Sequence, residues 1–213
     1  RFLAHDGEVM CPSEIHRNIH LLEGSPRLIV ELKPCPNYGL GLASFSVSSE
    51  YLKINSTKGE YSSFYLYSDL DFNTIMRGEP IALKASSYFV LSYHEKLTPV
   101  TQERVYLEYE RTKSYWMDWV YRTSAPEKYR EIVLRSIITL KLLMFQRTGA
   151  FVAASTTSLP EIKGGERNWD YRFCWMRDAS MIIDLFARIG HVIASENFIK
   201  FILGRMLLKS ENI

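Results

Sequence analysis

The sequence predicts an α+β chain in which an antiparallel β-sandwich precedes a helical part. Short runs rich in β-branched and aromatic residues recur between residues 27 and 109 with no helical pattern among them, and helical periodicities follow. The 213 residues are 46% hydrophobic, which is enough for a sizeable core. We therefore expect a β-sandwich domain over 1–110, a linker over 111–125 and a helical domain over 126–213.

Five short runs carry the strand pattern, and turn sequences containing Gly, Pro or Asn separate them. The apolar run over 88–93 is continuous, which predicts a strand covered on both faces. Val105, Leu107 and Tyr109 instead alternate as in a half-buried strand. The runs are RLIVELK (27–33), GLASFSV (41–47), SFYLYSD (63–69), SSYFVLSY (86–93) and RVYLEY (104–109).

A long helix is predicted after residue 124. Ser124 and Glu127 form an S-x-x-E capping box, and Pro126 falls in the first turn. We expect this helix to end near Gly149, with apolar residues at helical spacing on one side. They are Tyr129, Val133, Ile137, Leu140 and Met144.

Two more helices are predicted in the last third of the chain. One begins at about Asp178 and ends before Gly190, which stands where a C′ glycine would. Its apolar stripe consists of Met181, Ile182, Leu185, Phe186 and Ile189. The other covers about 194–210. Three helices with apolar residues on several sides need further cover, so the helical part looks too short to be whole.

Composition excludes several functions. Lys and Arg number 26 against 24 Asp and Glu without a basic stripe, which argues against nucleic acid. Cys11, Cys35 and Cys174 are an odd number without CxxC spacing, so neither a disulfide framework nor a zinc site is expected, and Cys174 fits a small buried residue. No signal peptide or membrane-spanning stretch is evident. We expect a cytoplasmic protein without metal or cofactor, and a chain that starts at Arg1 fits a fragment.

The stretch ERNWDYRFCWMRDA (166–179) places arginines and acids among aromatic rings. A buried segment would lack the charges and a solvated face would lack the rings, so the mixture predicts a concave polar surface lined by aromatics. In one regular helix, Tyr171, Trp175 and Asp178 would share a face. Arg177 would point away from it. Convergence of all four requires an irregular approach to the helix, and the preceding Pro and Gly residues supply one.

Each of these residues also has a purely structural interpretation. Asp178 fits a helix N-cap, whose carboxylate accepts from the amides of the first turn. Arg177 fits an ion-pair partner of Asp170 or Asp178. Trp175 and Tyr171 fit positions in a core.

Their combination favours a ligand site. An Arg next to an Asp can hold two neighbouring hydroxyls, and a Trp or Tyr can lie against the apolar face of a sugar ring. A phosphate would call for a glycine-rich loop or several cations, and a single Gly-Gly pair is a weak signal. The sequence therefore predicts a polyol site formed by Tyr171, Trp175, Arg177 and Asp178.

The stretch GAFVAASTTSLPEIKGGERNWDYRFCWMRDAS (149–180) resembles the signature around the first catalytic-domain helices of family 15 glycoside hydrolases. This family contains prokaryotic glucoamylases, glucodextranases and archaeal-type trehalases. The similarity extends through REIVLRSIITLKLL (130–143) and, more loosely, through residues 14–41, which are similar to the family's N-terminal β-sandwich. The resemblance covers most of the chain.

This resemblance implies an N-terminal antiparallel super-β-sandwich followed by the first helices of an incomplete (α/α)6 toroid barrel. It also implies inversion at an α-glucosidic bond. Trp175, Arg177 and Asp178 match the family's Trp-x-Arg-Asp segment, which holds the non-reducing terminal glucose in the −1 subsite. Tyr171 matches an active-site tyrosine.

The sequence departs from the family in two ways. Ser155 stands where the family usually has Pro. An inverting glycosidase also needs an acid and a base about 6.5–9.5 Å apart, and both family glutamates lie downstream of this motif. Glu161, Glu166 and Asp170 match neither position, so we expect no catalytic residue in this chain and no hydrolysis by it alone.

The expected function is that of an exo-acting α-glucoside hydrolase of the glucoamylase type, which releases glucose from non-reducing ends. A trehalase of the same family is the alternative. A non-catalytic carbohydrate-binding or interaction module is a further one. The expected partner is an α-glucan oligosaccharide or trehalose, without nucleic acid or membrane, and a homo-oligomer stays open.

Overall fold

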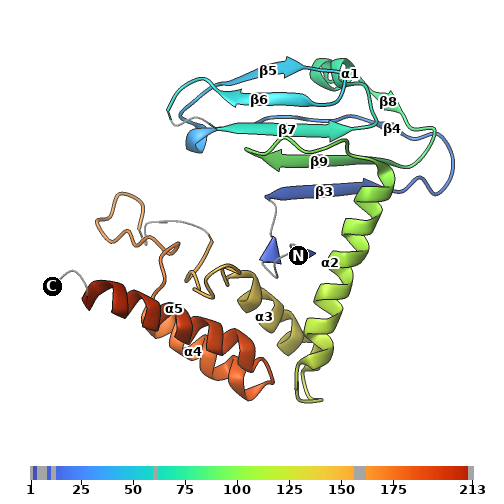
Figure 1. Ribbon diagram of the computed structural model, residues 1–213. Coiled ribbons are helices and arrows are strands. Elements are labelled where there is room, and N and C mark those ends of the chain that lie inside the picture. The colour runs from blue at the N-terminus through green and yellow to red at the C-terminus, as the bar shows by residue number, and fades with distance from the viewer. Residues whose placement is uncertain (1, 4–8, 11–12, 60–61, 156–161, 211–213) are drawn as a thin grey trace. The chain divides into compact units, whose positions relative to one another are not determined.

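The computed structural model describes residues 2–3, 9–10, 13–59, 62–155 and 162–210 (Figure 1). The chain divides into two compact units, Arg1–Ser114 and Tyr115–Ile213. Antiparallel strands dominate the first unit and helices dominate the second, which is the α+β composition that the sequence predicts.

The first unit is built on a five-stranded antiparallel sheet with the strand order β3-β9-β7-β6-β5 (Figure 1). Two smaller sheets, β1-β2 and β4-β8, have two strands each. A 3-10 turn, η1, covers Asn37–Gly39. The strands are β1 (Phe2–Leu3), β2 (Val9–Met10), β3 (Glu14–Ile19), β4 (Arg27–Leu28), β5 (Ala43–Val47), β6 (Leu52–Ser56), β7 (Ser63–Ser68), β8 (Ile81–Ala82) and β9 (Ser87–Tyr93).

Strand β9 is covered on both faces, as its continuous apolar sequence predicts. Tyr88 and Val90 pack in one hydrophobic cluster with Val105. Phe89 and Leu91, which alternate with them, pack against the cluster on the opposite face. The sheet therefore carries apolar side chains on both sides.

The short helix α1 (Phe72–Arg77) covers one of these faces. The Asp71 carboxylate caps it by accepting from the amide of Thr74 at 2.8 Å, and Gly78 ends it in the left-handed region at φ +64°. Phe72 and Ile75 point into the cluster formed by β6 and β7. Local capping and the burial of these two side chains thus act together to hold the helix.

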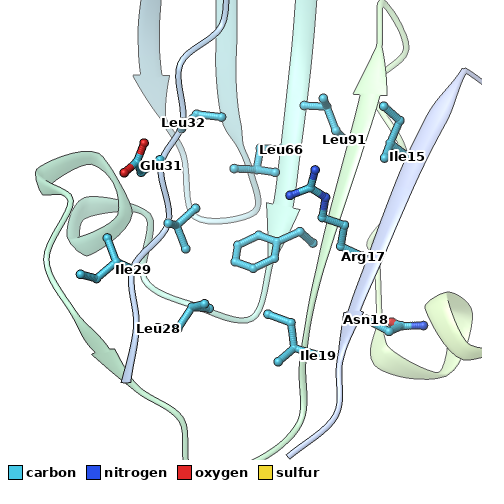
Figure 2. A pocket seen from close by; sticks show the side chains of 12 residues that line it. Ile15, Arg17, Asn18, Ile19, Leu28, Ile29, Glu31, Leu32, Leu66 and Leu91 are labelled. Carbon is cyan, nitrogen blue, oxygen red and sulfur yellow. The ribbon is translucent and has the colours of Figure 1, made fainter. Parts of the chain in front are cut away.

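An apolar cavity of about 600 Å³ remains between β3 and residues 28–32. Leu66, Phe89 and Leu91 line it from the sheet, and the Arg17 side chain of β3 enters it from the side (Figure 2). Asn18 and Glu31 are also polar, and the other lining residues are apolar. The cavity is therefore mainly apolar, with a few polar groups in its lining.

The strand predictions succeed for β5, β7 and β9 and are incomplete elsewhere. Of the predicted strand over 27–33, only Arg27–Leu28 pairs, with β8. Strands β3 and β6 were not predicted. In the sequence of β3, EIHRNI, polar residues interrupt the apolar ones, and the strand lies at the edge of the sheet.

The strand predicted over 104–109 is wrong, and the predicted linker over 111–125, within which the two units divide, is helical as far as Arg122. Residues Gln102–Arg122 form one helix, α2, and the division between the two units lies inside it. Only Val105 of the predicted strand is fully buried, whereas Leu107 and Tyr109 are about half exposed. Ion pairs at helical spacing run along α2, with Glu108–Arg111 at 3.2 Å and Asp118–Arg122 at 2.8 Å.

The capping box predicted at Ser124 is wrong as well. Helix α3 spans Arg130–Leu142, so it starts later and ends earlier than predicted. The amide of Ser124 donates to the carbonyl of Ile189 at 2.9 Å, and Tyr129, at φ +63°, precedes the first helical residue. A tertiary hydrogen bond thus replaces the local cap.

In the second unit α3 shares a hydrophobic core with α4 (Met176–Arg188) and α5 (Val192–Ser210). Helices α4 and α5 lie side by side, joined at Gly190, whose φ of +98° fits the predicted C′ position (Figure 1). The most buried side chains of this core are Ile137, Phe151, Ala179, Phe186 and Phe198. Met181, part of the predicted stripe, is 70% exposed.

A buried polar cluster lies beside this core. The imidazole of His191 stacks on the indole of Trp119 with centroids 3.5 Å apart. The Thr123 hydroxyl donates to the Trp119 carbonyl at 2.9 Å, so it accepts from His191 Nε2 at 2.7 Å. Burial, then the cations of Lys141 and Arg122, lower the pKa of His191 to about 4.

Candidate functional site

A short hairpin after α3 carries one wall of the candidate site. Met144 and Phe151 form an antiparallel bridge, and both are buried. The turn passes through Gly149 at φ +80°, where an added Cβ would lie 2.7 Å from the backbone carbon of Asn197. Only glycine fits at this distance from α5, so the hairpin is fixed against that helix.

The chain leaving this hairpin pairs with the motif region. The amide of Ala153 donates to the carbonyl of Phe173 at 3.2 Å, and the amide of Ala154 donates to that of Tyr171 at 2.9 Å. These bonds hold residues 171–173 in a non-helical path. The irregular approach to the helix that the sequence predicts is therefore present.

Helix α4 begins at Met176, two residues before the predicted start. Its N-cap is Trp175, in extended conformation at φ −86° and ψ 117°, without a side-chain cap. The N-cap interpretation of Asp178 is therefore wrong. Its carboxylate lies in the first turn, where the positive end of the helix dipole favours it.

The four residues predicted from the sequence line one cavity of about 380 Å³. It is within the size range of small-molecule sites. Two further residues complete the lining, Ala153 from the hairpin and Trp169 from the segment before Tyr171. Trp169 was not predicted as a site residue, because in an irregular segment the residue type alone does not show which rings face a cavity.

The rings in this cavity present faces in two directions. Tyr171 and Trp175 are inclined by only 27° with centroids 6.4 Å apart. Trp169 and Trp175 stand at 89° with centroids 6.3 Å apart. None of the three is fully buried, so the core interpretation of Trp175 and Tyr171 does not describe them.

Arg177 and Asp178 supply the charges. Arg177 Nη2 lies 3.5 Å from Asp178 Oδ2, and the two side chains are 76% and 40% exposed. A pair this long and this exposed contributes little to stability. The Arg177 guanidinium also lies 6.0 Å from the centre of the Trp175 ring. A donor and an acceptor are thus adjacent to an aromatic face, which is an arrangement that can hold a hydroxylated ring.

Asp170 supports the site from outside. Its carboxylate accepts from the Arg172 guanidinium at 2.7 Å and from the Arg172 amide at 2.9 Å. The side-chain hydrogen bond from Arg172, followed by the backbone one, lowers the pKa of Asp170. Its carbonyl accepts from the Trp175 indole N–H at 3.4 Å. Asp170 therefore pairs with Arg172 rather than with Arg177.

The remaining candidates take no part in the cavity. Glu166 is exposed, and Glu161 lies outside the described residues. Cys174 is half-buried against the helical core with a free thiol, close to its predicted role, and Cys35 is exposed. Cys11 is also outside the described residues. In the part of the chain that the structure describes, no group of His, Cys, Asp and Glu side chains could hold a metal ion.

The family model of the glycosyl hydrolases of family 15 matches residues 127–211, which include the whole cavity. The chain belongs to this family. All residues that line the cavity therefore lie within the segment that matches the family model.

Curated relatives agree with the family assignment. A trehalase of Thermoplasma acidophilum is 32% identical over 197 residues, which are 87% of this chain and 32% of the relative. A trehalase of Mycolicibacterium smegmatis is 36% identical over 116 residues, 54% of this chain and 17% of the relative. Trehalase 1 of Sulfolobus acidocaldarius is 40% identical over 93 residues, 44% of this chain and 16% of the relative. No solved structure matches the chain significantly.

The family 15 chain spans about a third of the length of the Thermoplasma relative. Among the residues that the structure describes, none of the helices has the length and apolar character needed to cross a membrane.

Proposed function

We propose that the protein is a family 15 hydrolase of the trehalase type and that this chain supplies the pocket for a terminal glucose. One observation carries the proposal: Tyr171, Trp175, Arg177 and Asp178 line a single cavity. It combines an apolar ring face with a donor and an acceptor, as a sugar requires.

The four residues would make different contacts with the glucose ring. The faces of Trp175 and Tyr171 contact the C–H face of the glucose ring. Arg177 donates to one outer hydroxyl, and Asp178 accepts from its neighbour. These contacts orient the glycosidic bond for attack by water.

The relatives favour trehalose over an α-glucan. All three relatives named above carry the name trehalase. The glucoamylase function, which was the first expectation from the sequence, therefore ranks second. The sandwich and the (α/α)6 barrel belong to the same proposal, with β3–β9 and α3–α5 as parts of the two domains.

The proposal assigns no acid or base to this chain. Hydrolysis with inversion adds water at the anomeric carbon while a protonated oxygen leaves, and two carboxyl groups about 6.5–9.5 Å apart perform it. Asp170 is occupied by Arg172. We therefore expect the 213 residues alone to release no glucose.

Kinetics of the complete gene product on trehalose and on maltooligosaccharides test the function. Trehalose turnover is expected, and turnover of neither sugar would overturn it. Arg177→Ala and Asp178→Asn should each lower kcat/KM for trehalose about 100-fold or more, because unpaired polar groups in a sugar site are costly.

A matched pair on the same helix provides the control. Asp184 and Arg188 form an ion pair at 2.9 Å on α4, away from the cavity. Asp184→Asn and Arg188→Ala should leave kcat/KM within about twofold. Equal losses in both pairs of variants would mean that Arg177 and Asp178 only stabilise α4.

A further inference from the structure

Of the three rings that line the cavity, Trp169 is perpendicular to Trp175, whereas Tyr171 is close to parallel with it. The plane of Trp169 stands at 89° to that of Trp175, whereas Tyr171 is inclined to Trp175 by 27°. Two aromatic surfaces at a right angle therefore meet beside Arg177 and Asp178.

Residue Trp169 is 49% exposed and borders the cavity. The Trp175 indole is anchored by its hydrogen bond to Asp170, whereas Trp169 contacts Trp175 edge to face. A large apolar face open to a cavity that also holds a charged pair offers a second stacking surface.

The angle between the two surfaces selects the shape of a ligand. In α,α-trehalose both anomeric carbons share one oxygen through axial bonds, so the two glucose rings are folded toward each other. In maltose the acceptor ring is joined through an equatorial oxygen, and the rings follow one another in a flatter ribbon. Perpendicular platforms match the folded disaccharide.

We infer that Trp169 is the platform for the second glucose ring and a specificity-determining residue for the folded α,α-1,1 linkage. The inference rests on the proposed function, since it takes the first ring to lie against Trp175. In that arrangement one glucose lies against Trp175 with its hydroxyls at Arg177 and Asp178, and the other lies against Trp169.

A purely structural role for Trp169 makes a different prediction. If the ring only supports Trp175, its removal disturbs the first glucose and lowers activity on every substrate equally. If it carries the second ring, its removal affects only substrates that have one. A substrate with a single ring separates the two roles, and α-glucosyl fluoride is such a substrate.

The test compares Trp169→Ala and Trp169→Phe in the complete gene product on trehalose, maltose and α-glucosyl fluoride. Trp169→Ala should lower kcat/KM for trehalose about tenfold or more, mainly through KM, and for α-glucosyl fluoride by less than about threefold. Trp169→Phe should recover most of the loss, because a smaller ring keeps the stacking face. Phe173→Ala removes a 68% exposed ring that does not line the cavity and should change none of the three values.

Each of the other outcomes would contradict a particular part of the inference. Equal losses on all three substrates make Trp169 a support for Trp175 and reject the platform. Equal losses on trehalose and maltose reject its preference for the folded linkage. If the unaltered protein hydrolyses none of the three, the proposed function itself is wrong, whatever the variants do.

Discussion

The imidazole of His191 lies parallel to the indole of Trp119, with 6° between the planes and 3.5 Å between the centroids. His191 is buried, and its pKa is lowered to about 4. The neutral ring is therefore the form that the fold accommodates, because a charged ring would face Lys141 in a desolvated site.

Stability of the second unit should fall with acid because of this histidine. The pKa rises from about 4 in the folded state to 6.5 in the unfolded state, so the contribution is complete above pH 6.5 and is lost as the pH falls toward 4. The loss amounts to up to about 3 kcal/mol. Urea unfolding between pH 4.5 and 7.5 measures it. All four tryptophans lie in residues 115–213, so tryptophan fluorescence reports on this unit.

Two variants isolate the effect. His191→Phe keeps a ring against Trp119 but cannot be protonated, so its stability should depend less on pH between 4.5 and 6.5. His20→Gln, at an exposed position, should retain the dependence of the unaltered protein. An unchanged slope in His191→Phe would assign the acid sensitivity to other groups.

Two glycines with the same backbone conformation allow the cost of a left-handed backbone to be distinguished from the cost of a steric clash of the added Cβ. Gly149 and Gly164 have φ of +80° and +81°, and an added Cβ at Gly164 meets nothing within 4 Å. Gly164→Ala should cost about 1 kcal/mol of unfolding free energy, from the left-handed backbone alone. Gly149→Ala should cost at least about 2 kcal/mol more, because its Cβ strikes the Asn197 backbone. Equal costs would contradict the close approach.

Phe186 is the central side chain of the helical core. It is fully buried, and its ring contacts those of Trp119 and Phe151 edge to face. Phe186→Ala should lower the unfolding free energy by about 3–5 kcal/mol, measured by urea unfolding. Phe173→Ala should change it by less than about 0.5 kcal/mol, since that ring is exposed.

Asp170 should act on turnover through Trp175. Asp170→Ala removes the carboxylate that accepts from the Arg172 amide and guanidinium. Without these bonds the turn is held less firmly, and with it the Asp170 carbonyl that accepts from the Trp175 indole. We expect about a tenfold loss of kcat/KM for trehalose. Asp170→Asn keeps an oxygen for the Arg172 amide and should retain most of the activity. If Asn and Ala lose equally, the ion pair rather than the turn positions the indole.

Local sequence patterns predicted correctly where burial or backbone conformation restricts the residue types that a position allows. The continuous run in β9 and the glycine after α4 are examples, since burial on both faces and a left-handed φ leave few alternatives. The motif itself predicted convergence, because the charges and rings of 166–179 fit neither a core nor a solvated face.

Where the sequence misled, tertiary contacts or spacing outweighed local preference. Val105, Leu107 and Tyr109 favour a strand by residue type, but acids and bases three or four apart, without Gly or Pro, favour the helix that forms. Ser124 offered a cap, and its amide instead bonds to Ile189, 65 residues later. Trp169 could not be placed, because residue type alone does not say which rings in an irregular segment face the cavity.

The close fit of Gly149 on Asn197 also orders events during synthesis. The hairpin leaves the ribosome 48 residues before its partner in α5, a delay of several seconds at about 5–20 residues per second. Until then the hairpin, which continues to the cavity-lining residue Ala153, lacks its close contact with Asn197. A nascent chain stalled before residue 197 should therefore expose the pocket segment to proteases and chaperones.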